Sequence, residues 1–340
     1  ERLKEKVDLA KQKILVNVGL NIVPSSLDAV TESRDLAMGY KINLVKQWSS
    51  FPTDDVSLRS LIDRATAIGK MVIFHAEEGG MVTELESRLK GNTSLGSYYR
   101  AHPPEAEDAA VARVLGCATQ RSARIHFCHI SSVSSLRLIS KAKREGRYVT
   151  CETTPHHMFL SEESSSGLGG VSVMDPPLRR RETARKLFEA FRRRIADIVA
   201  SDHAPHSIQE KTRDNWWEIL PGIPGLETTT PLLLTEVAKG TVSLKRVVEA
   251  LAESPARIFG INRGQLREGA VADIILVDMK RRFKIDSSTF FSKAKYSPFD
   301  GRRVTGKVIK TFVGGKLVYD DGRIVAEPGV GSIIYPKTSS

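Results

Sequence analysis

The chain has 340 residues, enough for one large domain or two ordinary ones, and its 41% hydrophobic and 27% charged residues exclude a disordered polymer. No run approaches the roughly 18–20 apolar residues of a membrane helix, so a membrane partner is not expected. The net charge of +11 permits contact with nucleic acid. However, the basic clusters 179–181 and 192–194 lack interleaved aromatic residues, so we expect a solvated surface and no nucleic-acid partner.

The cysteines and the first residues bear on the compartment of the protein and on its N-terminus. Its three cysteines, Cys117, Cys128 and Cys151, form no C-x-x-C pair and cannot make an even set of disulfides. This usage favours a reduced, cytoplasmic location. Residues 1–6 form a charged helical pattern without an initiator Met or an apolar signal segment. We therefore expect the natural N-terminus to lie upstream of this chain.

Short apolar, β-branched runs alternate with helix-patterned segments along most of the chain. The expected strands are residues 14–23, 39–45, 71–76, 124–130, 148–153 and 196–200, and the expected helices are 57–68, 105–120, 132–145 and 181–193. Such alternation predicts parallel βα units, hence an α/β sheet or barrel. The strands are continuously apolar, which predicts that both faces of the sheet are covered. An eight-stranded barrel would need two more strands, upstream of residue 1.

The pattern changes after Pro255. Residues 272–278, 306–313 and 316–319 read as short strands joined by glycine-rich turns, and Val313-Gly314-Gly315-Lys316 is a hairpin signal. We expect a barrel domain over residues 1–255, followed over 256–340 by a helix or loop and a small β module.

Ionisable side chains recur at or near the C-terminal ends of the apolar strands. They are Lys41, His75, His129, His156 with His157, and Asp202 with His203. In a parallel barrel these strand ends face one mouth, where active sites are built. Each residue alone has a structural explanation, such as a packed histidine, a snorkelling lysine or a helix N-cap. Their repetition on successive strands instead favours a site for Zn²⁺ or a similar divalent ion.

Several motifs follow one another in a recognisable order. They are His-Ala-Glu at 75–77, Cys-His-Ile-Ser at 128–131, Pro-His-His at 155–157, Pro-Pro-Leu-Arg at 176–179, Ser-Asp-His-Ala-Pro-His at 201–206 and Pro-Gly-Ile-Pro-Gly-Leu-Glu at 221–227. From about Gly39 to the C-terminus the chain resembles dihydroorotases, which belong with allantoinases and dihydropyrimidinases to the cyclic amidohydrolases. The resemblance implies a (β/α)8 TIM-type barrel of the amidohydrolase superfamily, with six of its eight strands visible here. It also implies reversible hydrolysis of dihydroorotate to N-carbamoyl-aspartate in de novo pyrimidine biosynthesis.

The resemblance assigns roles to particular residues. Lys41, carboxylated on its amine, is expected to bridge two zinc ions, with His75 and His129 as ligands of the second ion. Asp202 is expected to bind the first ion and to act as general base and acid. The groups expected to bind substrate are Asp175, His206, Pro221 and Gly222.

Physical chemistry supports these roles. Only a carbamate makes Lys41 a ligand, because an ammonium is a donor only. A hydroxide between two cations is available near neutral pH, and Asp202 can take its proton and deliver it to the leaving amide nitrogen. Asp175 would repel an anionic substrate unless it is otherwise engaged.

Some features depart from the family pattern. The His-x-His pair of the first strand and the following arginine are absent, since all eight histidines lie at or beyond His75. We expect a fragment, inactive on its own, rather than a shorter metal-poor relative. His102 is expected to be structural. His126 is left outside the site because a separation of three positions from His129 reverses the face of a strand.

Two alternatives to the dihydroorotase interpretation stay open. One is another cyclic amidohydrolase, a dihydropyrimidinase, hydantoinase or allantoinase. The other is a catalytically silent barrel that serves as a scaffold for a partner enzyme of pyrimidine synthesis. Expected partners are a small-molecule substrate and either a second copy in a homodimer or aspartate transcarbamoylase.

Overall fold

Six parallel strands in sequence order form the central sheet of the protein. The computed structural model describes residues 2–45 and 50–335. The strands are β2 (Asn21–Ile22), β3 (Gly39–Asn43), β4 (Met71–His75), β5 (Arg124–Phe127), β6 (Val149–Thr153) and β7 (Ile198–Val199). All six expected strands are thereby confirmed, but the first is divided. Its segment β1 (Val18–Gly19) pairs instead with β12 (Ile333–Ile334), near the other end of the chain.

The strands are buried on both faces, as their continuous apolar character predicts. Every residue of β4 is buried, and Tyr40, Phe74 and Phe127 are fully enclosed in the main core. Parallel register places Asn43 opposite His75. Within the described residues, β2 and β7 each have one strand neighbour, so they form the two edges of the sheet.

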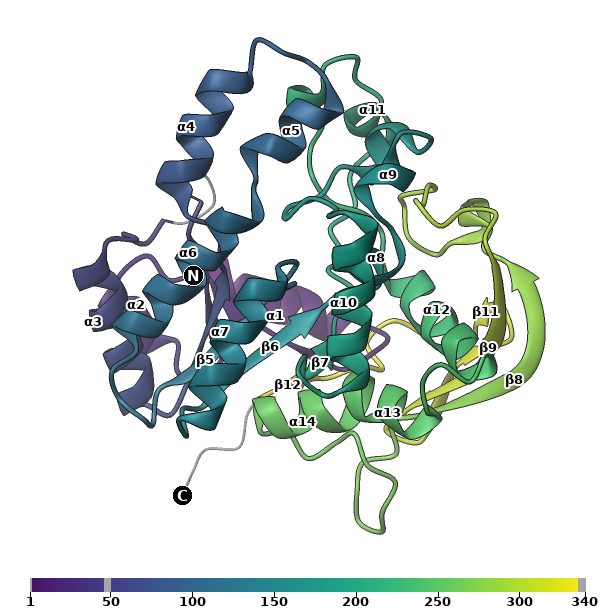
Figure 1. The fold of residues 1–340 in the computed structure, drawn as a ribbon. Helices are drawn as coiled ribbons and strands as arrows, with labels where there is room; N and C mark the ends of the chain where they lie inside the picture. Colours follow the sequence, from purple (N-terminus) through teal and green to yellow (C-terminus); the bar gives the residue numbers. More distant parts are fainter. Residues whose placement is uncertain (1, 46–49, 336–340) are drawn as a thin grey trace.

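Amphipathic helices form a layer outside the strands, and each contacts the next (Figure 1). The layer consists of α2 (Leu27–Glu32), α3 (Asp55–Ala67), α6 (Pro104–Cys117), α7 (Val133–Arg144) and α10 (Arg181–Arg192). The side-chain oxygens of Asp54 and Ser132 accept hydrogen bonds from the first turns of α3 and α7, which explains why these helices begin there. All four predicted helices are present within a few residues of their predicted bounds.

Shorter helices lie in the connections above the strand ends. A helical hairpin of α4 (Gly79–Leu89) and α5 (Leu95–Ala101) projects away from the sheet in Figure 1. The remaining short elements are α8 (Pro155–Phe159), α9 (Glu162–Ser165), η2 (Gly169–Ser172), α11 (Ile208–Lys211) and η3 (Trp216–Glu218). Helix α1 (Arg2–Lys13) precedes β1.

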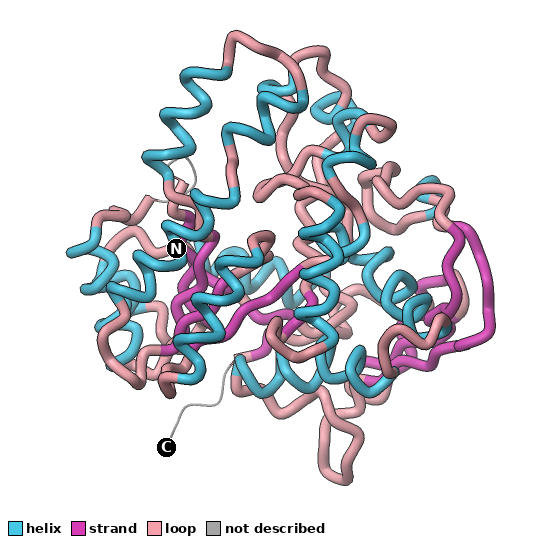
Figure 2. The backbone as a smooth tube through the Cα atoms, in the orientation of Figure 1, coloured by secondary structure: helices cyan, strands magenta, loops and turns pink. Residues whose placement is uncertain are grey.

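The C-terminal part carries a four-stranded antiparallel sheet, separate from the parallel one (Figure 2). Its strands are β8 (Ile274–Lys284), β9 (Arg303–Val313), β10 (Lys316–Asp320) and β11 (Arg323–Ile324), and β9 packs on α12 (Leu226–Ala238). The predicted hairpin is confirmed, since Val313 pairs with Lys316 across Gly314 and Gly315. Both glycines have positive φ, 56° and 81°, as a two-residue hairpin turn requires.

The segment between the two sheets is helical. It comprises α13 (Leu244–Val248), the π-helical turn η4 (Glu249–Glu253) and α14 (Ser254–Phe259), and η5 (Ser287–Thr289) follows β8. Helix α14 spans the expected domain boundary at residue 255, and that boundary stays a prediction. Across the described residues, no helix has the length and apolar character to cross a membrane.

Candidate metal and substrate site

The candidate metal ligands gather at one end of the parallel sheet. Lys41 lies in β3, His75 is the last residue of β4, and His129 and Asp202 follow β5 and β7 by two and three residues. His75 and His129 are 5–6% exposed, so both rings are buried. Burial raises the pKa of the Asp202 carboxyl to about 6, although the nearby charges of Lys41 and His75 act to lower it.

The two histidines face each other through their ring nitrogens. His75 Nδ1 lies 3.2 Å from His129 Nε2, while His75 Nε2 lies 2.8 Å from a carboxylate oxygen of Glu77. With Nε2 donating to Glu77, Nδ1 carries its lone pair toward His129. Burial, then the nearby His75 and Lys41, hold the pKa of His129 well below its ordinary value, which favours a neutral ring. Two imidazoles on one tetrahedral zinc place their nitrogens about 3.3 Å apart, so this pair fits a metal.

The backbone at two candidate ligands is unusual. His129 has φ of 34° and Asp202 has φ of 43°, in the left-handed region that few residues other than glycine adopt. Such conformations cost energy and cluster at functional sites. Both residues lie beyond the last residue of their strand. The regular alternation of side chains between the two faces of the sheet therefore does not extend to them.

Lys41 lies in a buried polar environment. Its Nζ donates a hydrogen bond to Cys128 Sγ at 2.8 Å. Burial alone would lower the pKa of Lys41, but the neighbouring Cys128, Glu152 and Asp202 raise it above its ordinary value. The surroundings of this amine therefore favour positive charge. Carboxylation of Lys41 stays a prediction.

A second group of potential ligands lies beside Lys41, and the sequence interpretation missed it. Ligand atoms of His126, Cys128 and Glu152 all lie within 4.8 Å of one another. His126 Nε2 is 3.0 Å from Glu152 Oε2, and its Nδ1 is 2.8 Å from Thr150 Oγ1. His126 and Cys128 are two positions apart and share a face, which the sequence could have indicated. The left-handed backbone at His129 breaks the alternation of faces, so the face of His126 cannot be counted from His129.

Glu77 is another residue that the sequence interpretation did not single out. It is fully buried, and its contact with His75 resembles the carboxylate–histidine pairs that orient metal ligands. Burial would raise the pKa of Glu77, but His102 and His75 hold it well below its ordinary value. The signal available in the sequence was a glutamate two positions after a strand-end histidine.

The structure also brings the predicted substrate residues close together. His206 Nε2 lies 2.9 Å from the carbonyl oxygen of Pro221, and the amide of Gly222 donates to Val173 O at 3.0 Å. Gly222 has φ of 130°, and a Cβ there would lie 2.3 Å from Ala204 O, so this position requires glycine.

Asp175 and Lys211 complete this end of the site. The Tyr98 hydroxyl donates to Asp175, which is thus engaged, and burial raises the pKa of the Asp175 carboxyl. Lys211, which the sequence interpretation missed, is fully buried and donates to the carbonyls of Val173 and Leu220 at 2.8 and 2.9 Å. Burial lowers the pKa of Lys211 to about 7.

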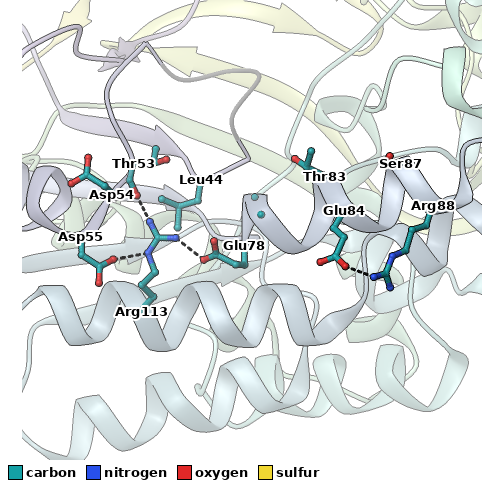
Figure 3. A pocket seen from close by; sticks show the side chains of 12 residues that line it. Leu44, Thr53, Asp54, Asp55, Glu78, Thr83, Glu84, Ser87, Arg88 and Arg113 are labelled. Carbon is teal, nitrogen blue, oxygen red and sulfur yellow. Dashed lines mark hydrogen bonds and ion pairs between the residues drawn. The ribbon is translucent and has the colours of Figure 1, made fainter.

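An open groove of about 1040 Å³ lies elsewhere, between α4 and the start of α3 (Figure 3). None of the predicted site residues lines it. Its charged groups are already paired: Arg113 contacts Asp55 and Glu78, and Arg88 contacts Glu84. The groove therefore offers no chemistry comparable to that of the strand ends.

Comparison with known proteins identifies the family of the chain. The model of the Amidohydrolase family matches residues 30–318, and the chain belongs to this family. The chain is therefore a hydrolase on a TIM-type barrel, as its resemblance implied, with a C-terminal antiparallel β module, as its strand and turn pattern predicted.

Within the family, the similar proteins include dihydroorotases and hydantoinases. The chain is 36% identical over 328 residues to a dihydroorotase of Methanothermobacter thermautotrophicus, covering 96% of this chain and 74% of that protein. It is 32% identical to an L-hydantoinase of Paenarthrobacter aurescens, covering 97% of this chain and 75% of that protein. The solved L-hydantoinase (dihydropyrimidinase) from Arthrobacter aurescens superposes with a TM-score of 0.93 at 30% identity, over 98% of this chain and 76% of that one.

Proposed function

We propose that the protein is a dihydroorotase, which hydrolyses dihydroorotate reversibly to N-carbamoyl-aspartate in de novo pyrimidine biosynthesis. The observation that carries the proposal is the pair of facing imidazole nitrogens of His75 and His129, 3.2 Å apart, at the strand ends where Asp202 also lies. Similarity to several dihydroorotases at 32–40% identity supports the choice of substrate.

The donor set suits a pair of zinc ions. His75 and His129 would hold one ion, Asp202 would bind the other, and Lys41 as a carbamate would bridge them. Bound zinc lowers the pKa of water and polarises a carbonyl oxygen. Glu77 keeps His75 in the tautomer whose Nδ1 lone pair is free for a ligand bond.

Asp202 is the proposed general base and acid. Its carboxylate takes the proton of the attacking water and delivers it to the amide nitrogen as the ring opens. A left-handed backbone fixes its direction from the end of β7. In the reverse reaction the same carboxyl group moves the proton in the opposite direction.

The substrate end would orient the ring and its carboxylate. His206 and the backbone at Pro221 and Gly222 form one connected unit, which would present fixed polar groups to the substrate. Asp175 is held by Tyr98, so its repulsion of an anionic substrate is reduced. In this role the protein would act in the cytoplasm, as a homodimer or together with aspartate transcarbamoylase.

A second candidate is hydantoin or dihydropyrimidine hydrolysis, favoured by the fold match to the L-hydantoinase. Assaying the protein with dihydroorotate, hydantoins and dihydropyrimidines distinguishes the two. We expect turnover of dihydroorotate, and turnover of hydantoins alone would contradict the proposal. Metal analysis tests the scaffold alternative: we expect two zinc ions per protein, with loss on Lys41→Ala, whereas a metal-free complete protein would favour the scaffold.

A further inference from the structure

His102 lies where three separate parts of the chain meet. It follows α5 directly, and its side chain is almost fully buried, with 3% of the residue exposed. Its ring packs against Tyr98, with ring centroids 5.1 Å apart, and its carbonyl oxygen accepts a hydrogen bond from Arg179. The position of this ring is therefore fixed by both side-chain and backbone contacts.

The first contact of the ring leads to the candidate metal ligands. His102 Nδ1 lies 3.3 Å from Glu77 Oε1, and the other oxygen of that carboxylate lies 2.8 Å from His75 Nε2. Glu77 thus bridges two histidines, one through each oxygen. Because the carboxylate is fully buried, it depends on these two ring contacts to offset the cost of its burial.

The other contacts lead to the substrate end and to the helical hairpin. His102 Nδ1 lies 3.9 Å from Asp175 Oδ1, and His102 Nε2 lies 3.4 Å from Glu86 Oε1 on α4. The ring therefore lies among three carboxylates. Although burial opposes a charged ring, Asp175 and Glu77 raise the pKa of His102 well above its ordinary value.

We propose that His102 is a positioning residue: its ring holds Glu77 against His75 and lies beside Asp175 at the substrate end, so that the α4–α5 hairpin fixes the direction of a candidate metal ligand. The part of this inference that concerns metal rests on the proposed function. The part that concerns hydrogen bonding is independent of the proposed function, because it states only which ring nitrogen of His75 bears the proton. If Glu77 turned away, His75 Nε2 would lose its acceptor and the proton could move to Nδ1, which would block the ligand bond.

The first test reads the His75 tautomer without any metal. Ring ¹⁵N signals of the metal-free, histidine-labelled protein would be recorded for the wild type and for His102→Gln, with His75 assigned by its loss in His75→Asn. We expect wild-type His75 to be protonated at Nε2 and His102→Gln to give a mixture of tautomers. His102→Arg should restore the wild-type signal, because a guanidinium donates to two carboxylates at once.

A matched control separates positioning from general loss of packing. Arg246 is equally buried, at 3% exposed, and its guanidinium donates to the carbonyl oxygens of Phe191 and Ala196, outside the candidate site. Arg246→Gln should therefore leave the His75 tautomer unchanged. An unchanged tautomer in His102→Gln would overturn the proposal. If His102→Gln fails to fold, a folded His102→Arg variant with an altered His75 tautomer would overturn it equally.

The second test measures Co²⁺ binding by titration of the visible absorption spectrum. We expect His102→Gln to bind Co²⁺ roughly tenfold more weakly, with an altered spectrum, as for other outer partners of metal ligands. His102→Arg should lie close to the wild type. Wild-type affinity and spectrum in His102→Gln would contradict the positioning role. Failure of the wild type to bind Co²⁺ would instead count against the proposed function, while the tautomer measurement still decides the role of His102.

Discussion

The metal end and the substrate end of the candidate site are built in different ways. Lys41 and His75 lie within paired strands, and the parallel register fixes where their Cα atoms lie. His206, Pro221 and Gly222 lie in connections, where single hydrogen bonds to carbonyl oxygens fix them. The metal end therefore depends on the core of the fold, whereas the substrate end depends on a few separate polar contacts. Changes at the two ends should give different kinetic and thermodynamic signatures.

The largest effect should come from Asp202→Asn, assayed with dihydroorotate. We expect kcat to fall by at least about 100-fold, because general acid–base groups typically contribute factors of 10²–10⁴. The KM should change little if the substrate end is held independently. Steady-state kinetics checks this, and a variant that retains kcat would remove Asp202 from the proposed mechanism.

Gly222→Ala should mainly affect the substrate end. The added Cβ would meet Ala204 O at 2.3 Å, and φ of 130° is unfavourable for alanine. We expect the free energy of unfolding to fall by about 2 kcal/mol and KM to rise more than kcat falls. Denaturant unfolding and kinetics measure both quantities. Loss of kcat at unchanged KM would mean that the two ends are not separate.

Lys211→Met should reveal that the buried amine of Lys211 makes a pH-dependent contribution to the free energy of unfolding. The pKa of Lys211 is lowered from 10.5 to about 7 in the folded protein, so between these values the unfolded state binds more protons. Wild-type stability relative to Lys211→Met should therefore rise with pH, by about 1 kcal/mol per pH unit between pH 7 and 9. The substitution also leaves two carbonyls without this donor and should cost about 2 kcal/mol at pH 9.

Urea unfolding of both proteins at pH 6, 7, 8 and 9 tests this sign and slope. Lys239→Met is a suitable control, because that lysine is half exposed and paired with Glu236. Parallel stability curves for the wild type and Lys211→Met would show that the buried amine does not titrate in this range.

The smallest effect should come from Tyr98→Phe. This change removes the hydroxyl that donates to Asp175 and leaves that carboxylate freer to repel an anionic substrate. We expect KM for dihydroorotate to rise by a factor equivalent to about 1 kcal/mol, with kcat nearly unchanged. A neutral hydantoin substrate should be less affected. Equal effects on both substrates would argue against charge as the cause.

The difference between features fixed by the core and features fixed by single contacts also explains what the sequence could predict. Periodicity identified all six parallel strands and four outer helices, because strands and helices that pack on a core need apolar residues at regular spacing. The hairpin at Gly314 and Gly315 was predictable because its turn needs two residues with positive φ. Lys41, His75, His129 and Asp202 were predicted as candidate ligands because strand ends of a parallel barrel converge on one mouth, and their role stays a prediction.

The contacts that the sequence interpretation missed join residues that are distant in the chain. His102 meets Glu77 across 25 positions and Asp175 meets Tyr98 across 77, and no local pattern encodes either contact. Lys211 reads as an ordinary surface lysine at the end of a short helix, yet it is fully buried by chain around Val173 and Leu220. The division of the first strand likewise needs the pairing of Val18 with Ile333.

The left-handed backbone at His129 and Asp202 has a consequence for how this protein can be made more stable. At each position, the residue that the proposed mechanism requires adopts a conformation that glycine would adopt at lower energy, by about 1 kcal/mol. His129→Gly should therefore be more stable than His129→Ala, which keeps the strain and also loses the ring. Selection for thermal stability alone would drive these two positions toward glycine, whereas selection for catalysis would retain them. The local conflict between fold and chemistry is thus concentrated at these two strand ends.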